Sequence, residues 1–360
     1  MLKACIIGCG KQADAHASVM QSIPGCEIVG VCDREELMAK QLFERFSVKK
    51  YYNDAKKMLD DAKPDVVHIV TPPQSHLMLG KLCLEAGSHI YFEKPFALNA
   101  TEAKQLIDLA NENKLKITVG HNNQYGHAAL RMRKLINDGW LGGHPIHLES
   151  IWCYDLGDTR FAAALLGDKN HWVRGLPGKL LHNIISHGVA RIAEFIKSDS
   201  PEIIAHGYRS PLVSGLNETD IIDELRVIIH DPNNISAYFT FSTQISPMIR
   251  QFRVFGPKGS LLLDDMHQTL VPVVRTNYKS YLNHFVPPVI YAKRYAKNSL
   301  DNVCKFLRRD FHFDAGRKYL IEAFYSSIRD GGPLPISYKE IMVTSTIMDS
   351  IFNQIYRKQV

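Results

Sequence analysis

The chain has 360 residues, which exceeds the length at which a single hydrophobic core usually stops growing, so we expect two domains. Its 45% hydrophobic and 22% charged residues exclude a chain that is mainly disordered or fibrous. The formal net charge of +6 is modest, and basic residues are interleaved with acidic ones. We therefore expect no nucleic-acid partner, whereas an anionic substrate would suit the charge.

The seven cysteines are scattered and lie mostly inside apolar runs, as reduced cysteines of the cytoplasm do. The first residues run directly into an expected strand, without the basic segment and apolar stretch of a signal peptide. No apolar stretch reaches the roughly 18 residues that cross a bilayer. The sequence predicts a cytoplasmic protein without a membrane span.

The first third of the chain alternates short β-branched runs with longer amphipathic stretches. Strands that are apolar on both faces and separated by helices predict a parallel sheet covered on both sides. We therefore expect residues 1–121 to form a doubly wound α/β domain of the Rossmann type. The expected strands are 4–7, 27–32, 66–70, 89–92 and 116–119.

The pattern changes after Gly120, where a predicted helix over 128–137 is followed by extended runs with no helices between most of them. Such a series predicts a mostly antiparallel open sheet, so residues 122–360 are expected to form a second, α+β domain. The tail over 315–356 predicts two helices separated by the breaker at 331–333. The expected strands are 146–154, 202–208, 223–229, 235–242, 250–254 and 260–263.

A glycine turn follows the first expected strand and opens a helix, with the pattern GxGxxA over residues 8–13. Glycines at this place let the backbone approach a pyrophosphate that sits on the helix N-terminus. Alone, the pattern is equally typical of an ordinary tight turn. The cofactor-binding residues expected here are Gly8, Cys9, Gly10, Lys11 and Gln12.

Asp33 ends the second expected strand, 25 residues after Gly8. A carboxylate at this distance lies near the adenosine ribose hydroxyls and would repel a 2′-phosphate, which favours NAD. Arg34 follows immediately, so NADP stays open as the cofactor. Both residues are predicted to contact the cofactor.

Two further clusters stand at the ends of the next expected strands, at 71–76 and 93–95. Ligands of open α/β sheets bind outside the carboxyl ends of the strands, so both clusters are placed to meet a cofactor. The cofactor-binding residues predicted here and after the last strand are Thr71, Pro72, His76, Glu93, Lys94 and Asn122.

With Gly120-His121-Asn122, these motifs resemble the Gfo/Idh/MocA family of NAD(P)-dependent oxidoreductases, and the resemblance extends through 255–260 and 321–335. The resemblance implies a Rossmann domain followed by an open, largely antiparallel sheet. In the family that sheet supplies the substrate pocket and often an oligomer interface, so we expect a homodimer or homotetramer.

The most specific motif is Glu93-Lys94-Pro95. By itself a lysine is most often an exposed surface residue. The resemblance instead implies that Lys94 is catalytic and contacts both cofactor and substrate hydroxyl, where an ammonium could steady an alkoxide or relay its proton. Glu93 would orient the loop, and Pro95 would fix its backbone, with a cis peptide bond as an option.

The run from 178 to 187 predicts the start of one helix, on which Asn183 and His187 are four residues apart and share a face. The resemblance assigns this pair to the substrate site, with His187 as the catalytic proton acceptor. Many relatives have aspartate where this chain has Asn183, so the amide is expected to bind or orient substrate. A lone helical histidine is more often a core residue, and His182 is the weaker candidate.

Tyr125, Trp172 and Arg174 flank these clusters and are expected to bind substrate, although aromatic residues near helix starts are often simply packed. The sequence has no His-Glu-x-x-His motif, no paired Cys-x-x-Cys motif and no calcium loop. We therefore expect no metal ion.

The segment 283–312 is basic and aromatic. We favour an inserted helical arm that lies on the protein or on a partner subunit, and a peripheral membrane contact is the alternative. Its basic face would also suit a substrate that carries phosphate, such as a nucleotide sugar.

The predicted function is hydride transfer between nicotinamide and a carbinol or keto carbon of a sugar, cyclitol or nucleotide sugar. One alternative is a redox-neutral, NAD-dependent glycosidase. Another is a non-catalytic dinucleotide-binding regulator, which Asn183 favours and the intact Lys94 motif opposes.

Overall fold

The computed structural model describes residues 1–155, 168–215, 218–279, 281–311 and 315–356. The chain divides into two compact units. The first consists of Met1–His121 with Arg317–Thr346, and the second of Asn122–Gly316 with Ile347–Val360. The sequence had suggested that 122–360 would stay together; instead, residues 317–346 return to the first unit.

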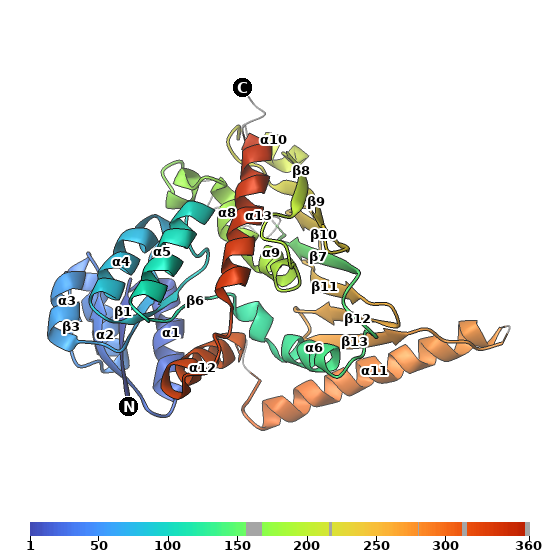
Figure 1. Ribbon diagram of the computed structural model, residues 1–360, viewed down its shortest axis with the longest axis horizontal. Helices are drawn as coiled ribbons and strands as arrows, with labels where there is room; N and C mark the ends of the chain where they lie inside the picture. Colours follow the sequence, from blue (N-terminus) through green and yellow to red (C-terminus); the bar gives the residue numbers. More distant parts are fainter. Residues whose placement is uncertain (156–167, 216–217, 280, 312–314, 357–360) are drawn as a thin grey trace. The chain divides into compact units, whose positions relative to one another are not determined.

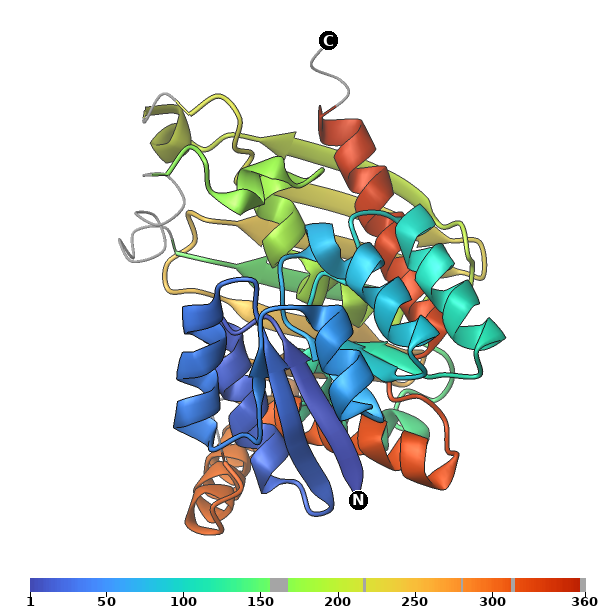
Figure 2. The ribbon, with the colours of Figure 1, turned by 90° about the vertical axis from the view of Figure 1, so that its left-hand side faces the viewer.

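The sheet of the first unit has six parallel strands in the order β3-β2-β1-β4-β5-β6. This order confirms the predicted doubly wound Rossmann fold. Helices flank the strands on both sides (Figure 2). The strands are β1 (Leu2–Ile7), β2 (Cys26–Cys32), β3 (Tyr51–Tyr52), β4 (Val66–Ile69), β5 (His89–Phe92) and β6 (Ile117–Val119).

Two helices of the first unit, α3 and α5, begin where a short polar side chain satisfies a free N–H group. Asp54 accepts from the N–H of Lys57, and Asn99 accepts from the N–H of Glu102. The helices are α1 (Lys11–Ser22), α2 (Glu36–Phe46), α3 (Ala55–Ala62), α4 (His76–Glu85), α5 (Ala100–Glu112) and α12 (Ala315–Asp330), with a 3₁₀ turn over Pro73–Ser75. The last helix, α13 (Tyr338–Tyr356), begins in the first unit and ends in the second.

The sheet of the second unit has seven strands in the order β13-β12-β11-β7-β10-β9-β8. Every neighbouring pair is antiparallel except β7 and β10, which confirms the predicted mostly antiparallel sheet. The strands are β7 (His147–Cys153), β8 (Glu202–Tyr208), β9 (Glu224–Asp231), β10 (Ile235–Ser242), β11 (Arg250–Phe255), β12 (Gly259–Asp264) and β13 (Thr269–Val274).

One predicted helix of the second unit, which carries the predicted substrate residues Asn183 and His187, differs from the structure. The helix expected from residue 178 is two short helices, α8 (Lys179–Ile184) and α9 (Ser186–Ala193), joined at Ile185, which keeps helical backbone angles. The remaining elements are α6 (His127–Asn137), α10 (Pro211–Gly215) and α11 (Leu282–Leu307), with 3₁₀ turns over Asn122–Tyr125 and Trp172–Gly175.

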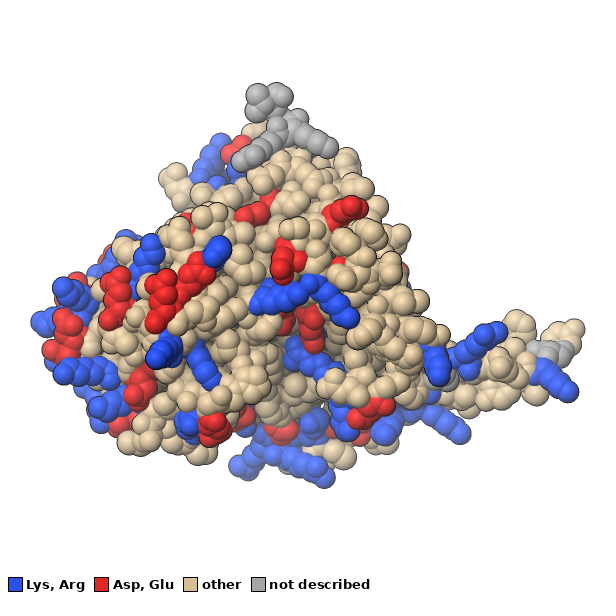
Figure 3. Space-filling view, in the orientation of Figure 1, with Lys and Arg blue, Asp and Glu red and all other residues tan. Residues whose placement is uncertain are grey.

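Most of the segment 283–312 forms the single long helix α11, which runs along the edge strand β13 (Figure 1); His312 lies outside the described residues. Lysine and arginine side chains stand at intervals along it, with other surface between them (Figure 3). Among the residues that the structure describes, no helix is both long enough and apolar enough to cross a membrane.

Helix α9 is held against the sheet by close backbone approach and by a buried charge. A Cβ at Gly188 would lie 2.5 Å from the ring of Phe239, so only glycine fits there. Arg191 is 1% exposed and donates to Asp265 and to the carbonyl oxygen of Asn123, both at 2.6 Å. This arginine therefore joins α9, the Asn122–Tyr125 turn and the loop after β12.

We expect Arg191→Met to lower the free energy of unfolding of the second unit by about 3–5 kcal/mol, because it leaves Asp265 buried and unpaired. The double variant with Asp265→Leu should recover most of that loss. Arg253→Met, which removes an ion pair that is partly open to solvent, should cost less than about 1 kcal/mol. Tryptophan fluorescence during urea unfolding measures this, since all three tryptophans belong to the second unit. Equal losses in the single and double variants would contradict the expectation.

Candidate active site

The glycine turn brings the ends of β1 and β4 into contact. Gly8 has φ +96°, and a Cβ there would lie 2.8 Å from Thr71 Cγ2 and 2.9 Å from the Thr71 backbone nitrogen. A Cβ at Gly10 would meet nothing within 4 Å. Gly10 is also the N-cap of α1 and offers no side-chain cap, so the first N–H groups of that helix are the groups that a pyrophosphate would meet.

Asp33 binds the glycine turn with one carboxylate oxygen. Its Oδ2 accepts from the N–H of Cys9 at 2.7 Å, and its Oδ1 accepts from the N–H of Glu35 at 3.0 Å. Each oxygen keeps a lone pair for a ribose hydroxyl. Arg34 beside it is exposed. The residues of this edge of the sheet therefore fit a dinucleotide.

Two other predicted cofactor residues at the start of α1 are exposed, namely Lys11 and Gln12. The Gln12 side chain accepts from Arg317 of α12 at 2.9 Å. Cys9 is buried, and burial raises the pKa of its thiol. Its backbone N–H, and not its thiol, is thus the group that Cys9 supplies to this edge.

His76 is a brace between the loops that follow β4 and β5. One of its ring nitrogens lies 2.9 Å from the carbonyl oxygen of Thr71, and the other lies 3.0 Å from that of Phe96. The ring is buried and its pKa is lowered by burial, so the neutral imidazole donates to one of these two carbonyl oxygens and only contacts the other. We therefore assign His76 to positioning the loops, while Thr71 and the exposed Pro72 stay candidates for cofactor contact.

Glu93 is a buried, ionised carboxylate at the end of β5, 6% exposed. Its Oε1 accepts from His16 at 2.9 Å, and its Oε2 accepts from the backbone N–H of Lys94 at 3.1 Å. Burial alone would raise the pKa of Glu93, but the bond from His16 and the charges of Arg317 and Lys94 hold it well below its usual range. This environment fits the predicted orienting role.

Lys94 is half-buried at the end of β5, and its peptide bond to Pro95 is cis. His121 follows β6, the neighbouring strand, and is 2% exposed. Burial and, second, the positive charge of Lys94 lower the pKa of His121 to about 3. The positive charge of Lys94 therefore acts on two neighbours: it helps to keep Glu93 ionised and His121 neutral.

A chain of buried hydrogen bonds extends behind Glu93 and was not predicted. The Nδ1 atoms of His16 and His68 are 2.8 Å apart, and His68 Nε2 lies 2.8 Å from the hydroxyl of Tyr325 on α12. Burial lowers the pKa of both imidazoles, so both are neutral at pH 7. The only sequence signal was two histidines at positions that the pattern places in the core.

The protons of this chain have one consistent arrangement. Glu93 only accepts, so His16 carries its proton on Nε2 and accepts at Nδ1. His68 then donates from Nδ1 and accepts at Nε2 from the Tyr325 hydroxyl. Every donor points toward Glu93, and α12 thereby fixes the carboxylate beside Lys94 from inside the unit.

In the second unit, the two substrate residues predicted in the run from 178 to 187 belong to different helices. Asn183 lies in α8 and His187 near the start of α9, and both are half-buried. The His187 ring lies 5.5 Å from that of Trp152, over which the Arg250 guanidinium sits at 4.8 Å. His182 is buried and stacks on Phe352, so it belongs to the core.

Of the three flanking candidates, Trp172 is the most open, at 38% exposed. Tyr125 is 9% exposed, and the Arg133 guanidinium covers its ring at 4.7 Å. Arg174 donates through two nitrogens to Glu218, at 2.9 and 3.0 Å. The guanidinium of Arg174 is thus already paired with the carboxylate of Glu218. This pairing favours a structural role for Arg174 over the predicted substrate contact. Asn122, which was predicted to contact the cofactor, is buried, at 7% exposed.

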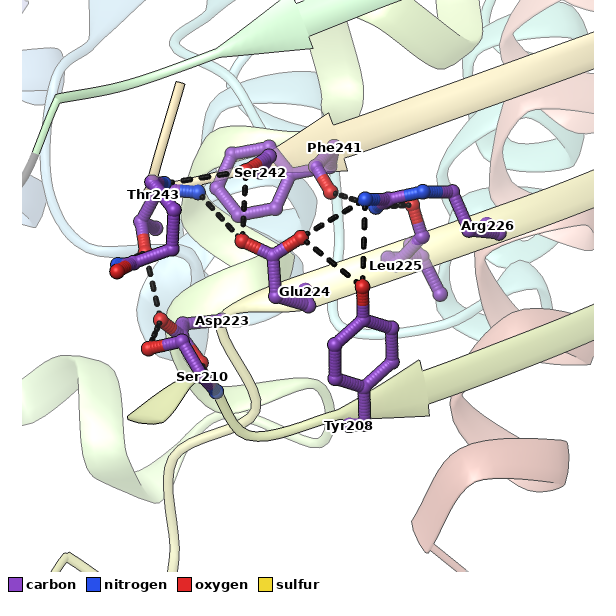
Figure 4. Close-up of polar contacts among 10 residues, drawn as sticks. Tyr208, Ser210, Asp223, Glu224, Leu225, Arg226, Phe241, Ser242 and Thr243 are labelled. Carbon is purple, nitrogen blue, oxygen red and sulfur yellow. Dashed lines mark hydrogen bonds and ion pairs between the residues drawn. The ribbon is translucent and has the colours of Figure 1, made fainter. Parts of the chain in front are cut away.

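A second buried polar cluster joins the starts and ends of β8, β9 and β10 (Figure 4). Asp223 accepts from the hydroxyls of Ser210 and Thr243, both at 2.6 Å. Glu224 accepts from Ser242 at 2.6 Å and from Arg226 at 2.9 Å. Both carboxylates accept hydrogen bonds from protein donors, and these bonds hold the strand ends together. Within the described ranges, no three His, Cys, Asp or Glu side chains are grouped to hold a metal ion.

Comparison with known proteins agrees with the glycine turn and the strand-end motifs. Residues 2–121 match the Gfo/Idh/MocA family model, described as an oxidoreductase family with an NAD-binding Rossmann fold. Residues 2–121 are therefore similar to the NAD-binding Rossmann domain of that family. NAD is therefore the cofactor class of the first unit.

The similar proteins either match only part of this chain or match most of it at low sequence identity. D-glucoside 3-dehydrogenase of Escherichia coli is 31% identical over 142 residues, which span 39% of this chain and only 40% of that protein. The trans-1,2-dihydrobenzene-1,2-diol dehydrogenase of Mus musculus is 23% identical over 88% of this chain and 89% of its own. A levoglucosan dehydrogenase structure, a complex with NADH and levoglucosan, has TM-score 0.78 at 19% identity, covering 99% of this chain and 98% of that one. That likeness shows the same fold.

Two glycines of the turn should respond differently to alanine. Gly8→Ala should lower the free energy of unfolding by about 1–3 kcal/mol, because its methyl group meets the Thr71 backbone and its φ is positive. Gly10→Ala has room and should leave unfolding nearly unchanged while weakening NADH binding. Urea unfolding and NADH fluorescence titration measure the two effects. A Gly8→Ala protein as stable as the wild type would contradict the close approach.

Acidification should destabilise the first unit. His16, His68, His76 and His121 have folded pKa values below their ordinary 6.5, so below that pH the unfolded chain binds more protons. Each contributes a loss of up to about 1.4 kcal/mol per pH unit as the pH falls. The lowered pKa of Glu93 adds a further loss below its ordinary 4.5.

Urea unfolding followed by circular dichroism between about pH 7.5 and pH 5 measures this slope. His121→Gln should make the slope shallower. A free energy of unfolding that is flat or rises on acidification would overturn the assignment of neutral buried histidines.

Proposed function

We propose that the protein is an NAD-dependent oxidoreductase that transfers hydride between nicotinamide and a hydroxyl-bearing or keto carbon of a sugar-type substrate. The observation that carries the proposal is the setting of Lys94. It is half-buried at the end of β5, its backbone N–H is held by an ionised Glu93, and its positive charge helps to keep His121 neutral. An ammonium carried by a backbone held in this way is suited to stabilising an alkoxide.

NAD, when bound, supplies the hydride acceptor or donor at nicotinamide C4. In the proposal, Lys94 donates a hydrogen bond to the substrate oxygen and stabilises the negative charge that develops on it. His187 is the second candidate for exchanging the hydroxyl proton, because an imidazole exchanges protons near neutral pH. Asn183 would bind or orient a neighbouring hydroxyl.

Asp33 supports NAD over NADP, since its carboxylate would meet the charge of a 2′-phosphate, while the exposed Arg34 makes NADP the form to test beside it. A relative named D-glucoside 3-dehydrogenase supports a sugar-type substrate, and the net charge of +6 suits one that carries phosphate or a nucleotide. The exposed Trp172 is the aromatic side chain that could stack on a sugar ring. We also propose a cytoplasmic location and a homodimer or homotetramer, with a peripheral membrane contact of 283–312 as the alternative to contact with a partner subunit.

The test is NADH or NADPH formation with sugars, cyclitols and nucleotide sugars as substrates. We expect Lys94→Ala to lower kcat by at least 100-fold, because the group stabilises the reacting oxygen, and His187→Asn to lower kcat less. Lys104→Ala, an exposed lysine of α5, is the matched control and should keep full activity.

A Lys94→Ala enzyme with unchanged kcat would overturn the role of Lys94. Release of an aglycone without net NADH would instead indicate the redox-neutral glycosidase. NADH binding without turnover of any substrate would indicate the dinucleotide-binding regulator.

A further inference from the structure

Helix α11 is attached to the second unit through its polar side. Asn298 is 3% exposed, and its side-chain amide bonds both the N–H and the carbonyl oxygen of Leu270 on β13, each at 3.0 Å. Asp301 pairs with Arg131 at 3.3 Å, and Asn302 donates to the His267 carbonyl oxygen at 2.9 Å. These contacts fix which side of the helix faces inward.

The outward side is apolar, which inverts the usual arrangement of a surface helix. Eight outward positions are spaced alternately three and four residues apart, and all eight are exposed. Phe285 and Phe306 are 64% and 67% exposed. We call these positions the seam: Leu282, Phe285, Val289, Ala292, Ala296, Ser299, Val303 and Phe306.

The spacing and the charges favour a second helix over a membrane as the covering surface. An alternating three-four spacing is the heptad pattern of a coiled coil, whose seam is narrower than the apolar face of a membrane-surface helix. Two basic residues of α11, Arg294 and Lys297, lie on the inward side, where they line a cavity of about 330 Å³. Lys305 pairs with Asp310. These three cations therefore do not flank the seam. The exposed Lys293, next to a seam position, does flank it, but one lysine is fewer than the cluster that binds anionic lipid.

The spacing of the seam positions is the same from either end, and in an antiparallel pair Val289 meets Ser299. In an antiparallel pair, Leu282 meets Phe306 and Phe285 meets Val303 of the other copy, while the small Ala292 and Ala296 meet at the centre. Bulky side chains thus fill both ends, and small ones allow close approach between them. The helix dipoles oppose each other favourably in this arrangement.

The basic residues at the C-terminal end of α11 also select the antiparallel arrangement. Lys305, Arg308 and Arg309 follow one another there, and the two arginines are exposed. A parallel pair would bring the clusters of both copies together. An antiparallel pair separates them by about 36 Å, well beyond the screening length of about 8 Å at physiological salt.

The area is sufficient for a specific contact. The five large seam side chains are each 51–67% exposed, so each presents on the order of 100 Å². Leu300 and Leu307, 65% and 74% exposed, flank the seam and add to it. Two paired helices would bury on the order of 1,000 Å² or more in total, which reaches the lower end of specific interfaces.

We propose that α11 pairs antiparallel with α11 of a second copy of this chain through the seam, about a two-fold axis between Ala292 and Ala296. The interface is isologous, so each copy contributes the same eight positions. It is independent of the dehydrogenase activity and places the basic arm in assembly rather than in substrate binding.

Cysteine cross-linking tests the orientation. In a Cys304→Ser background, which removes the exposed cysteine of α11, Phe285→Cys and Val303→Cys are made in two differently tagged copies of the full chain and co-expressed. We expect a disulfide-linked dimer of the two different copies under mild oxidation. Each variant expressed alone should give none, since positions 285 and 303 meet each other and not themselves.

Linkage of either variant with itself would overturn the antiparallel arrangement. Absence of linkage in every sample would overturn pairing through α11, whatever other contacts hold the copies together.

A charge placed on the seam provides a second measurement. Val303→Asp should raise the dissociation constant of the assembly at least tenfold in sedimentation equilibrium. Cys304→Asp places the same charge one residue away, off the seam, and should leave the constant unchanged. Equal effects of the two substitutions would overturn the proposal.

Flotation with phosphatidylserine-containing vesicles separates the membrane alternative. Vesicle binding that Val303→Asp abolishes, with no mixed cross-link in solution, would replace the second copy by lipid. We expect no binding.

Discussion

The first unit depends on one buried negative charge. Glu93 is held by His16 from α1, by the N–H of Lys94 and by the nearby charge of Arg317 on α12. An unpaired carboxylate at this depth would cost several kcal/mol, so these donors must be brought to the end of β5. The return of 317–346 to the Rossmann unit follows from this requirement, because α12 supplies Arg317 and, through the two histidines, Tyr325.

The same carboxylate determines the chemistry available at the edge of the sheet. Glu93 binds the backbone N–H of Lys94, and the positive charge of Lys94 helps to keep His121 neutral. A neutral neighbour does not compete for an anionic oxygen. The proposed role of Lys94 therefore depends on the way in which the charge of Glu93 is buried, and not on the lysine alone.

Local sequence patterns were sufficient to predict many of the strands. The ranges of β5, β8 and β10 agree with the predicted strands to the residue, because hydrophobic periodicity and turn residues define both ends. β13 was missed because Pro272 inside it is typical of non-strand segments, yet an edge strand tolerates proline. The break between α8 and α9 at Ile185 was not predicted, because no glycine or proline stands there. The pairs His16–His68 and Arg174–Glu218 join residues 52 and 44 positions apart, so only the folded chain brings them together.

Helix α11 shows where pattern and packing must be combined. Pro287 and Pro288 had suggested an interruption, but each removes only one helical hydrogen bond, and the carbonyl groups left over belong to exposed residues that water reaches. The alternation of apolar residues along the helix is visible in the sequence, yet it does not say which side faces the protein. Asn298 decides this, because its amide replaces a strand partner for Leu270 and turns the polar side inward. With that side fixed, the apolar seam faces away from the unit, and its size and spacing are those of a surface that a second helix covers in the proposed pairing.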